Sequence, residues 1–178
     1  MYTYIALLRA VNLAGRARLP MNRLRELTEA AGGHDARTYL NSGNVVFDSE
    51  HPSAAQAATA LGELLTRDGL NTAVMVRTGE HLLELATAGH PDAAHDPDHT
   101  HLQVAFPLAA ITPQQLAAMP IPGNERATLR CGEICLHYPD GLGRSTLTTA
   151  RLHKHLGTPV TCRNWRTVAA LAELARTR

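Results

Sequence analysis

The side chains best suited to hold a ligand lie in a polar turn between two short apolar runs. Tyr39-Leu40 and Val45-Val46-Phe47 flank Asn41-Ser42-Gly43-Asn44, which is typical of a β-hairpin with a polar tip. Glycine adopts a positive φ without steric cost, and asparagine is the next most tolerant residue. The hydroxyl and amide groups of this turn can orient a ligand, or they can bond the turn backbone.

Two other segments offer arginines for an anion. Residues 12–18, with Arg16 and Arg18, precede an expected helix; the arginines can contact an anion at the hairpin tip or remain solvated. Gly141-Leu142-Gly143-Arg144-Ser145 opens a further expected helix. Glycine amides, a helix N-terminus and an arginine together favour anion binding. The alternative for this segment is a tight turn in which Ser145 caps the helix.

A third candidate cluster is Arg163-Asn164-Trp165 near the end of the chain. In one arrangement Trp165 anchors the last helix in the core while Asn164 caps it. In the other, Arg163 stacks on the indole of Trp165 and faces a ligand, because a planar guanidinium suits carboxylate and phosphate. The sequence leaves both arrangements open.

Patterns for metal binding and catalysis are weak. Histidines and aspartates alternate over residues 90–101, but their spacing is irregular and unlike H-E-x-x-H, so no metal site is predicted. The acidic residues suggest no catalytic carboxylate pair, and neither Ser42 nor Ser145 lies in a G-x-S-x-G elbow. The residues identify no cofactor and no reaction, and they leave open whether the protein is an enzyme.

Composition narrows the class of protein. The chain has 178 residues, 44% of them hydrophobic, which suffices for one large core or two small ones without a metal or disulfide. Its 17 basic and 16 acidic residues nearly balance, so any affinity for anions must be local. The three cysteines lack zinc-type spacing, and no apolar run approaches a membrane span. We therefore expect a cytoplasmic protein with reduced thiols and no membrane partner.

Apolar periodicity and helix breakers predict the same order of elements twice. Residues 1–89 read as βαββαβ plus a linking helix, residues 89–100 as a linker, and residues 101–178 as βαββαβ plus a terminal helix. This order is the ferredoxin-like split unit. The fold class is therefore α+β, with two ferredoxin-like halves, antiparallel sheets and extra helices. The expected helices cover residues 20–31, 52–68, 78–88, 145–156 and 164–176, together with one that begins at Thr112.

Strand direction brings distant polar segments together. In a βαββαβ sheet the first two strands run one way and the last two run the other, so loops far apart in sequence share a sheet edge. The expected ligand-binding residues of the first half are Arg9, Asn12, Arg16, Arg18, Asn41, Ser42 and Asn44. Those of the second half are Arg144, Ser145, Arg163, Asn164 and Trp165.

Three spaced signatures resemble the DUF1697 family, a domain of unknown function. They are the strand Tyr4–Arg9 followed by Asn12, the hairpin Thr38–Phe47 and the tail Thr161–Val168. Ala10 and Ala14 stand where the family commonly has glycine, and Cys162 stands where threonine is usual, so Cys162 is not expected to be a nucleophile. The resemblance extends over nearly the whole chain and implies no established activity.

Several function classes remain open. We favour binding of a small anionic or phosphorylated ligand at the polar loop clusters. The alternatives are a single-stranded nucleic-acid module, an enzyme acting on a phosphorylated substrate, and a subunit of an assembly. RNA-recognition modules share the element order and stack bases on sheet aromatics. Tyr2, Tyr4 and Phe47 fall on strands that we expect to be adjacent, where they could take this role. An aromatic content of only 4% weighs against that alternative, and no oligomeric state is indicated.

Overall fold

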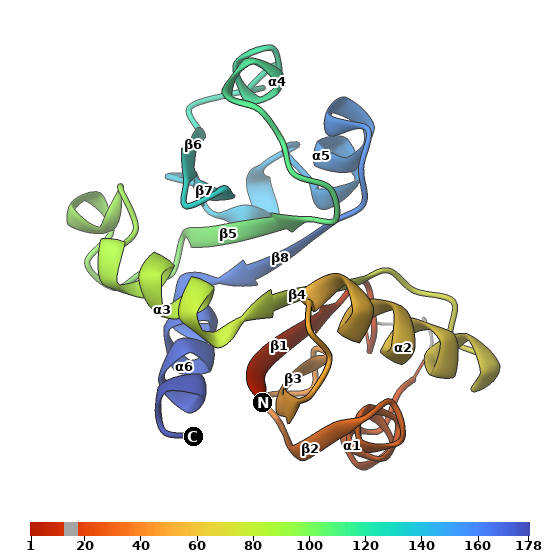
Figure 1. Ribbon diagram of the computed structural model, residues 1–178. Coiled ribbons are helices and arrows are strands. Elements are labelled where there is room, and N and C mark those ends of the chain that lie inside the picture. Colours follow the sequence, from red (N-terminus) through yellow and green to blue (C-terminus); the bar gives the residue numbers. More distant parts are fainter. Residues whose placement is uncertain (13–17) are drawn as a thin grey trace. The chain divides into compact units, whose positions relative to one another are not determined.

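The computed structural model describes residues 1–12 and 18–178 and has two compact units (Figure 1). Met1–Leu83 and Leu171–Arg178 form the first unit, and Glu84–Ala170 form the second. Each unit contains a four-stranded antiparallel sheet. The expected α+β class with two ferredoxin-like sheets is confirmed.

The first unit follows the order βαββαβ. Its central strand pairs antiparallel with two neighbours, giving the sheet order β2-β3-β1-β4 of a ferredoxin-like unit. A helix then follows the fourth strand. The elements are β1 (Tyr2–Leu8), α1 (Met21–Ala30), β2 (Gly33–Thr38), β3 (Asn44–Ser49), α2 (Ala54–Arg67), β4 (Val74–Thr78) and α3 (Gly79–Ala88).

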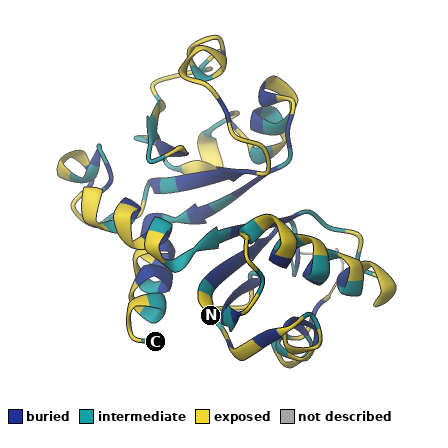
Figure 2. Ribbon diagram, viewed as in Figure 1, coloured by how far each residue is buried: buried dark blue, intermediate teal, exposed yellow. Residues whose placement is uncertain are grey.

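Both helices α1 and α2 cover one face of the first sheet (Figure 1). Successive side chains of a strand point to opposite faces, so Tyr4, Ala6 and Leu8 of β1 share this face. They are fully buried with Leu24 of α1 and Leu61 of α2. Figure 2 shows the result as dark blue central strands beneath helices whose outer faces are yellow. Hydrophobic burial along this face stabilises the sheet, at whose edge Asn12 and the hairpin tip lie.

The second unit repeats the order and has the sheet order β6-β7-β5-β8. The helix between its first two strands, α4, begins with the expected capping box, in which Thr112 and Gln115 satisfy each other's backbone amides. Two short 3₁₀ turns, Ala93–His95 and Leu142–Arg144, lie outside the sheet. The elements are β5 (Leu102–Pro107), α4 (Pro113–Ala117), β6 (Arg126–Arg130), β7 (Glu133–His137), α5 (Thr149–Leu156), β8 (Val160–Asn164) and α6 (Trp165–Arg176).

One helix begins later than the sequence predicts. The helix expected over residues 145–156 starts at Thr149, and Thr148 caps it by accepting a hydrogen bond from the Arg151 amide. Ser145 ends the preceding 3₁₀ turn, so its amide and hydroxyl serve that turn and its neighbours. The prediction that this segment opens a helix is therefore wrong. No described helix is long and apolar enough to cross a membrane.

Candidate functional site

The polar cluster of the first unit forms at the end of β1, as strand direction predicts. Asn12 Nδ2 donates to the Asn41 carbonyl at 2.8 Å and to the Leu19 carbonyl at 2.9 Å. Asn12 Oδ1 accepts from the Leu19 amide at 2.8 Å. The Gly43 carbonyl accepts from the Leu8 amide at 2.9 Å. These bonds fasten the hairpin tip to the segment after β1.

Side chains at this tip mainly bond the turn itself. Asn44 is fully buried, and its Nδ2 donates to the Tyr39 carbonyl at 2.9 Å and to Ser42 Oγ at 2.8 Å. Arg9 is half-buried and Arg18 is exposed. Arg16, which was expected to bind the ligand, lies outside the described residues. Of the two roles open to these side chains, the structure therefore gives contacts for bonding within the turn.

The cluster after β8 adopts the helix-capping arrangement. Asn164 Oδ1 accepts from the Arg166 amide at 2.9 Å at the start of α6, and Trp165 is buried with its ring edge-on to His90 at 5.5 Å between centroids. Arg163 is buried, and one guanidinium nitrogen donates to Thr161 Oγ1 at 2.8 Å. Burial lowers the pKa of Arg163 to about 10, which leaves it charged at neutral pH.

The histidine- and aspartate-rich segment 89–101 packs against the second sheet through hydrogen bonds. Asp92 Oδ1 accepts from Arg126 at 2.9 Å, and Asp96 Oδ2 accepts from the His101 amide at 2.7 Å. Desolvation lowers the pKa of the buried imidazole of His90, which favours its neutral form. No three potential ligands in the described part of the chain are arranged to hold a metal ion. Asp92 and Asp96 therefore have structural partners.

The aromatic residues considered for base stacking lie mostly in the core. Tyr4 is 1% exposed and Phe47 is 3% exposed, both under the helices of the first unit. The Tyr4 hydroxyl donates to the His51 carbonyl at 2.7 Å. Tyr2 alone of these three is exposed, at 53%. Because buried rings cannot stack on bases, the observation that suggested nucleic-acid binding does not apply to this sheet face.

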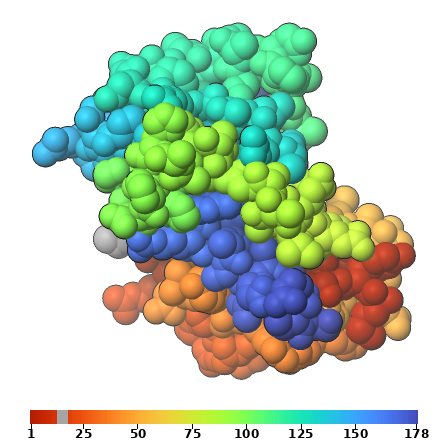
Figure 3. All heavy atoms as spheres, turned by 90° about the vertical axis from the view of Figure 1, so that its left-hand side faces the viewer, coloured from red at the N-terminus to blue at the C-terminus, as the bar shows by residue number. Residues whose placement is uncertain are grey.

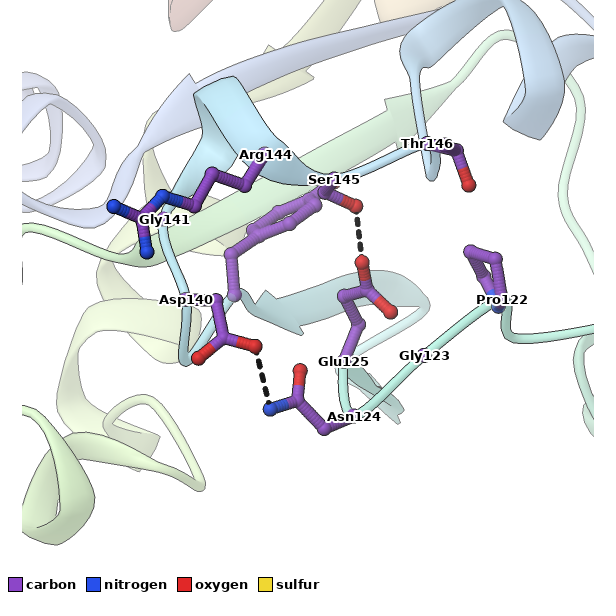
Figure 4. A pocket seen from close by; sticks show the side chains of 10 residues that line it. Pro122, Gly123, Asn124, Glu125, Asp140, Gly141, Arg144, Ser145 and Thr146 are labelled. Carbon is purple, nitrogen blue, oxygen red and sulfur yellow. Dashed lines mark hydrogen bonds between the residues drawn. The ribbon is translucent and has the colours of Figure 1, made fainter.

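A polar cavity of about 490 Å³ lies in the second unit, between the segment before β6 and the segment after β7. Its volume is in the range of small-molecule sites. Of the residues expected from sequence it includes Arg144 and Ser145, whereas Arg163, Asn164 and Trp165 are not part of its wall. The lining residues are Pro122, Gly123, Asn124, Glu125, Tyr138, Asp140, Gly141, Arg144, Ser145 and Thr146 (Figure 4).

A serine and a glutamate meet inside this cavity. Ser145 Oγ donates to Glu125 Oε1 and accepts from the Leu147 amide at 2.9 Å (Figure 4). The other carboxylate oxygen, Glu125 Oε2, is buried and has no hydrogen-bond partner among the described residues. A Cβ on Gly123 would lie only 2.9 Å from Oε2, so any residue with a side chain at this position would crowd the oxygen. An unsatisfied buried acceptor costs about 1–3 kcal/mol, which favours a donor from outside the protein.

Arginine and a second carboxylate lie elsewhere in the cavity wall. Asn124 Nδ2 donates to Asp140 Oδ2 at 2.9 Å. Arg144 is exposed, and within residues 1–12 and 18–178 its guanidinium has no hydrogen bond or ion pair. Figure 4 shows the guanidinium reaching away from the Ser145–Glu125 pair. The positive charge of Arg144 and the negative charge of Glu125 therefore lie at separate positions in the cavity wall.

Two backbone amides of this segment serve the turn itself. The Arg144 amide donates to the Gly141 carbonyl at 3.3 Å, and the Ser145 amide donates to the Leu142 carbonyl at 3.2 Å. These bonds close the 3₁₀ turn, and α5 begins only at Thr149. Arg144 and Ser145 thus line the cavity from a 3₁₀ turn rather than from the helix start that the glycine-rich pattern predicts. No sequence pattern indicated that Asn124, Glu125 and Asp140 would line the same cavity as Arg144 and Ser145.

Fold and site together define an α+β protein with two ferredoxin-like sheets and a polar cavity in its second unit. The chain belongs to the DUF1697 family, described as proteins of unknown function, whose family model matches residues 1–137. The fold is similar to the solved structure of the conserved bacterial protein SP0830 from Streptococcus pneumoniae. That likeness has a TM-score of 0.74 at 17% identity and covers 98% of each chain, so it concerns the fold alone. No curated protein matches the chain.

Proposed function

We propose that the protein binds a small molecule with one anionic group, a carboxylate or a phosphate, in the cavity of its second unit. The observation that carries this proposal is the guanidinium of Arg144, which has no hydrogen bond or ion pair within the described part of the chain and lies in the wall of a cavity of about 490 Å³. A guanidinium offers paired N–H donors that match carboxylate and phosphate oxygens. Thr146 and Asn124 add polar groups that can orient the rest of the ligand.

The charge of the wall limits what the cavity accepts. Glu125 and Asp140 line it together with Arg144, so carboxylates outnumber the arginine. Like charges within such a site repel each other, and polyanions are disfavoured. This argues against a nucleoside triphosphate or a nucleic-acid strand and for a ligand with a single anionic group. No reaction is assigned to the site.

Titration calorimetry with ethyl phosphate and propionate as probes tests the proposal. Binding is expected for at least one probe, and Arg144→Ala should weaken it by at least about tenfold, since a charge-assisted pair is lost. Arg67→Ala is the matched control, because Arg67 lies exposed on α2, where it pairs with Glu63 at 3.5 Å. The proposal is wrong if neither probe binds the native protein, or if Arg144→Ala leaves the affinity unchanged.

A further inference from the structure

We infer that the ligand of this cavity also carries a protonated amine, which binds Glu125 Oε2. The inference rests on the proposed function, because it concerns the other end of the molecule held by Arg144. The expected ligand class is therefore zwitterionic, such as an amino acid or an aminoalkyl phosphate. Three features of the cavity carry the argument.

First, the carboxylate of Glu125 is held in place with one oxygen unused. Ser145 Oγ donates to Oε1, and the Leu147 amide donates to Ser145 Oγ at 2.9 Å, so the serine itself is fixed. Oε2 is buried without a partner in the described residues. A carboxylate oriented in this way offers its free oxygen to a donor that enters the cavity.

Second, no side chain at position 123 crowds this buried oxygen. Gly123 has no side chain, and a Cβ there would come within 2.9 Å of Oε2 and 3.7 Å of Glu125 Cδ. No positive φ requires glycine at this position, in contrast to Gly141 with φ +83°. The absence of a side chain therefore matters for the space beside Glu125 rather than for the turn geometry.

Third, the charges are arranged for a molecule with two different ends. The guanidinium of Arg144 reaches away from the Ser145–Glu125 pair (Figure 4), so one small anion cannot use both. Asp140 is exposed and already accepts from Asn124 at 2.9 Å, which leaves the buried Glu125 oxygen as the less satisfied acceptor. An ammonium there forms a charge-assisted hydrogen bond, roughly twice as strong as one from a neutral donor. It also offsets the excess of carboxylates in the wall.

The test compares ligands that differ only in the amine. Calorimetry is run with ethyl phosphate against 2-aminoethyl phosphate, and with propionate against β-alanine. The native protein should bind the aminated member of each pair at least about tenfold more tightly. Glu125→Gln should bring the two affinities to within about twofold without weakening ethyl phosphate, whereas Arg144→Ala should weaken every probe.

Gly123→Ala provides a second variant that leaves the carboxylate in the chain. The added methyl group should displace Glu125 Oε2 and remove the preference for the amine, while binding of ethyl phosphate persists. Glu63→Gln, on the exposed face of α2, is the matched control and should keep the preference. Equal affinities for both members of a pair in the native protein would overturn this inference and leave the proposed function standing. Absence of binding by all four probes would overturn both.

Discussion

The three cysteines are all free thiols, and they differ in how far they are buried. Cys135 is fully buried on β7, whereas Cys131 is half-buried in the β6–β7 turn. Desolvation raises the pKa of Cys135 to about 12, and it also raises the pKa of Cys162. Thiolate formation at these two positions is therefore opposed by the fold. Neither has the lowered pKa that a nucleophilic cysteine requires.

Raised thiol pKa values predict a loss of stability in alkali. An acid with a higher pKa in the folded state stabilises the fold fully below its unfolded pKa, and that contribution disappears as the pH rises through the folded pKa. For Cys135 this interval runs from 9.0 to about 12. Near pH 10 the loss is on the order of 1 kcal/mol. Urea unfolding near pH 7.5 and pH 10 should thus show a smaller alkaline loss in Cys135→Ala than in the native protein.

Cys131→Ala serves as the control for this prediction and should keep the native alkaline loss. Tyr138, whose pKa is also raised by burial, contributes only above its ordinary pKa of 10.0. Both variants keep Tyr138, so the difference between them reports on the cysteine thiols. An alkaline loss that is the same with and without the Cys135 thiol would show that its burial does not govern the pH dependence.

Residue patterns singled out two of the ten residues that line the cavity. Arg144 and Ser145 stood out because glycines and an arginine before an expected helix are a recognisable combination. Glu125 could not, because its role depends on Ser145, which lies 20 residues away along the chain. A single glutamate in a loop with proline and glycine is most often solvated. Its unsatisfied oxygen exists only once the two segments are folded together.

At the scale of elements, strand direction predicted more than residue types did. The meeting of Asn12 with the hairpin follows because β1 and β2 both run antiparallel to β3 and therefore end at the same sheet edge. The length of the turn could not be predicted, because Leu40 adopts a positive φ of 56° that leucine rarely takes. Ala10, where the family commonly has glycine, likewise has a positive φ of 54°. Tertiary contacts around the tip impose these conformations against local preference.

Gly43 should be intolerant of any side chain. Its φ is +75°, and a Cβ would lie 2.4 Å from Val11 Cγ2 and 2.9 Å from Leu8 Cβ. Gly69 has a similar φ of +87° in the same unit, but a Cβ there would meet nothing within 4 Å. Alanine at Gly69 should cost about 1–2 kcal/mol from backbone strain. Alanine at Gly43 should cost a further ~1–3 kcal/mol, because the core must move.

Urea denaturation followed by circular dichroism measures both variants against the native protein. The comparison holds backbone strain nearly constant, so the difference between Gly43→Ala and Gly69→Ala reports the clash alone. Equal losses would mean that the hairpin tip has room to move away from the segment after β1. That result would also weaken the case for a fixed polar cluster at this sheet edge.

At the scale of the whole chain, the repeated βαββαβ order was predictable because helix and strand periods are local properties. It was not predictable that the last residues of the chain belong to the first unit. Leu171–Arg178 belong to the unit formed by Met1–Leu83, and the contact of Arg178 with the Val46 carbonyl joins residues 132 positions apart. Figure 3 shows the dark blue C-terminal atoms beside orange atoms of that unit. Local patterns carry no information on such a return.

Arg178 should stabilise the first unit through contacts that its neighbour Arg176 lacks. The Arg178 side chain is 3% exposed, lies 3.3 Å from Asp48 Oδ2 and donates to the carbonyls of Val46, at 3.1 Å, and Asp35. Arg178→Ala would leave the partly buried Asp48 carboxylate without this cation. The free energy of unfolding should fall by about 1–3 kcal/mol, as is usual for hydrogen bonds to charged groups.

Arg176→Ala is the matched control, since Arg176 pairs with Glu173 in an exposed position and little change is expected there. Hydrogen exchange locates the effect: amides of β2 and β3 should exchange faster in Arg178→Ala, while those of α5 in the second unit should not change. If both arginine variants behave alike, the buried contacts of Arg178 contribute no more than an exposed pair. Faster exchange throughout both units would instead mean that the C-terminal segment stabilises the chain as one cooperative body.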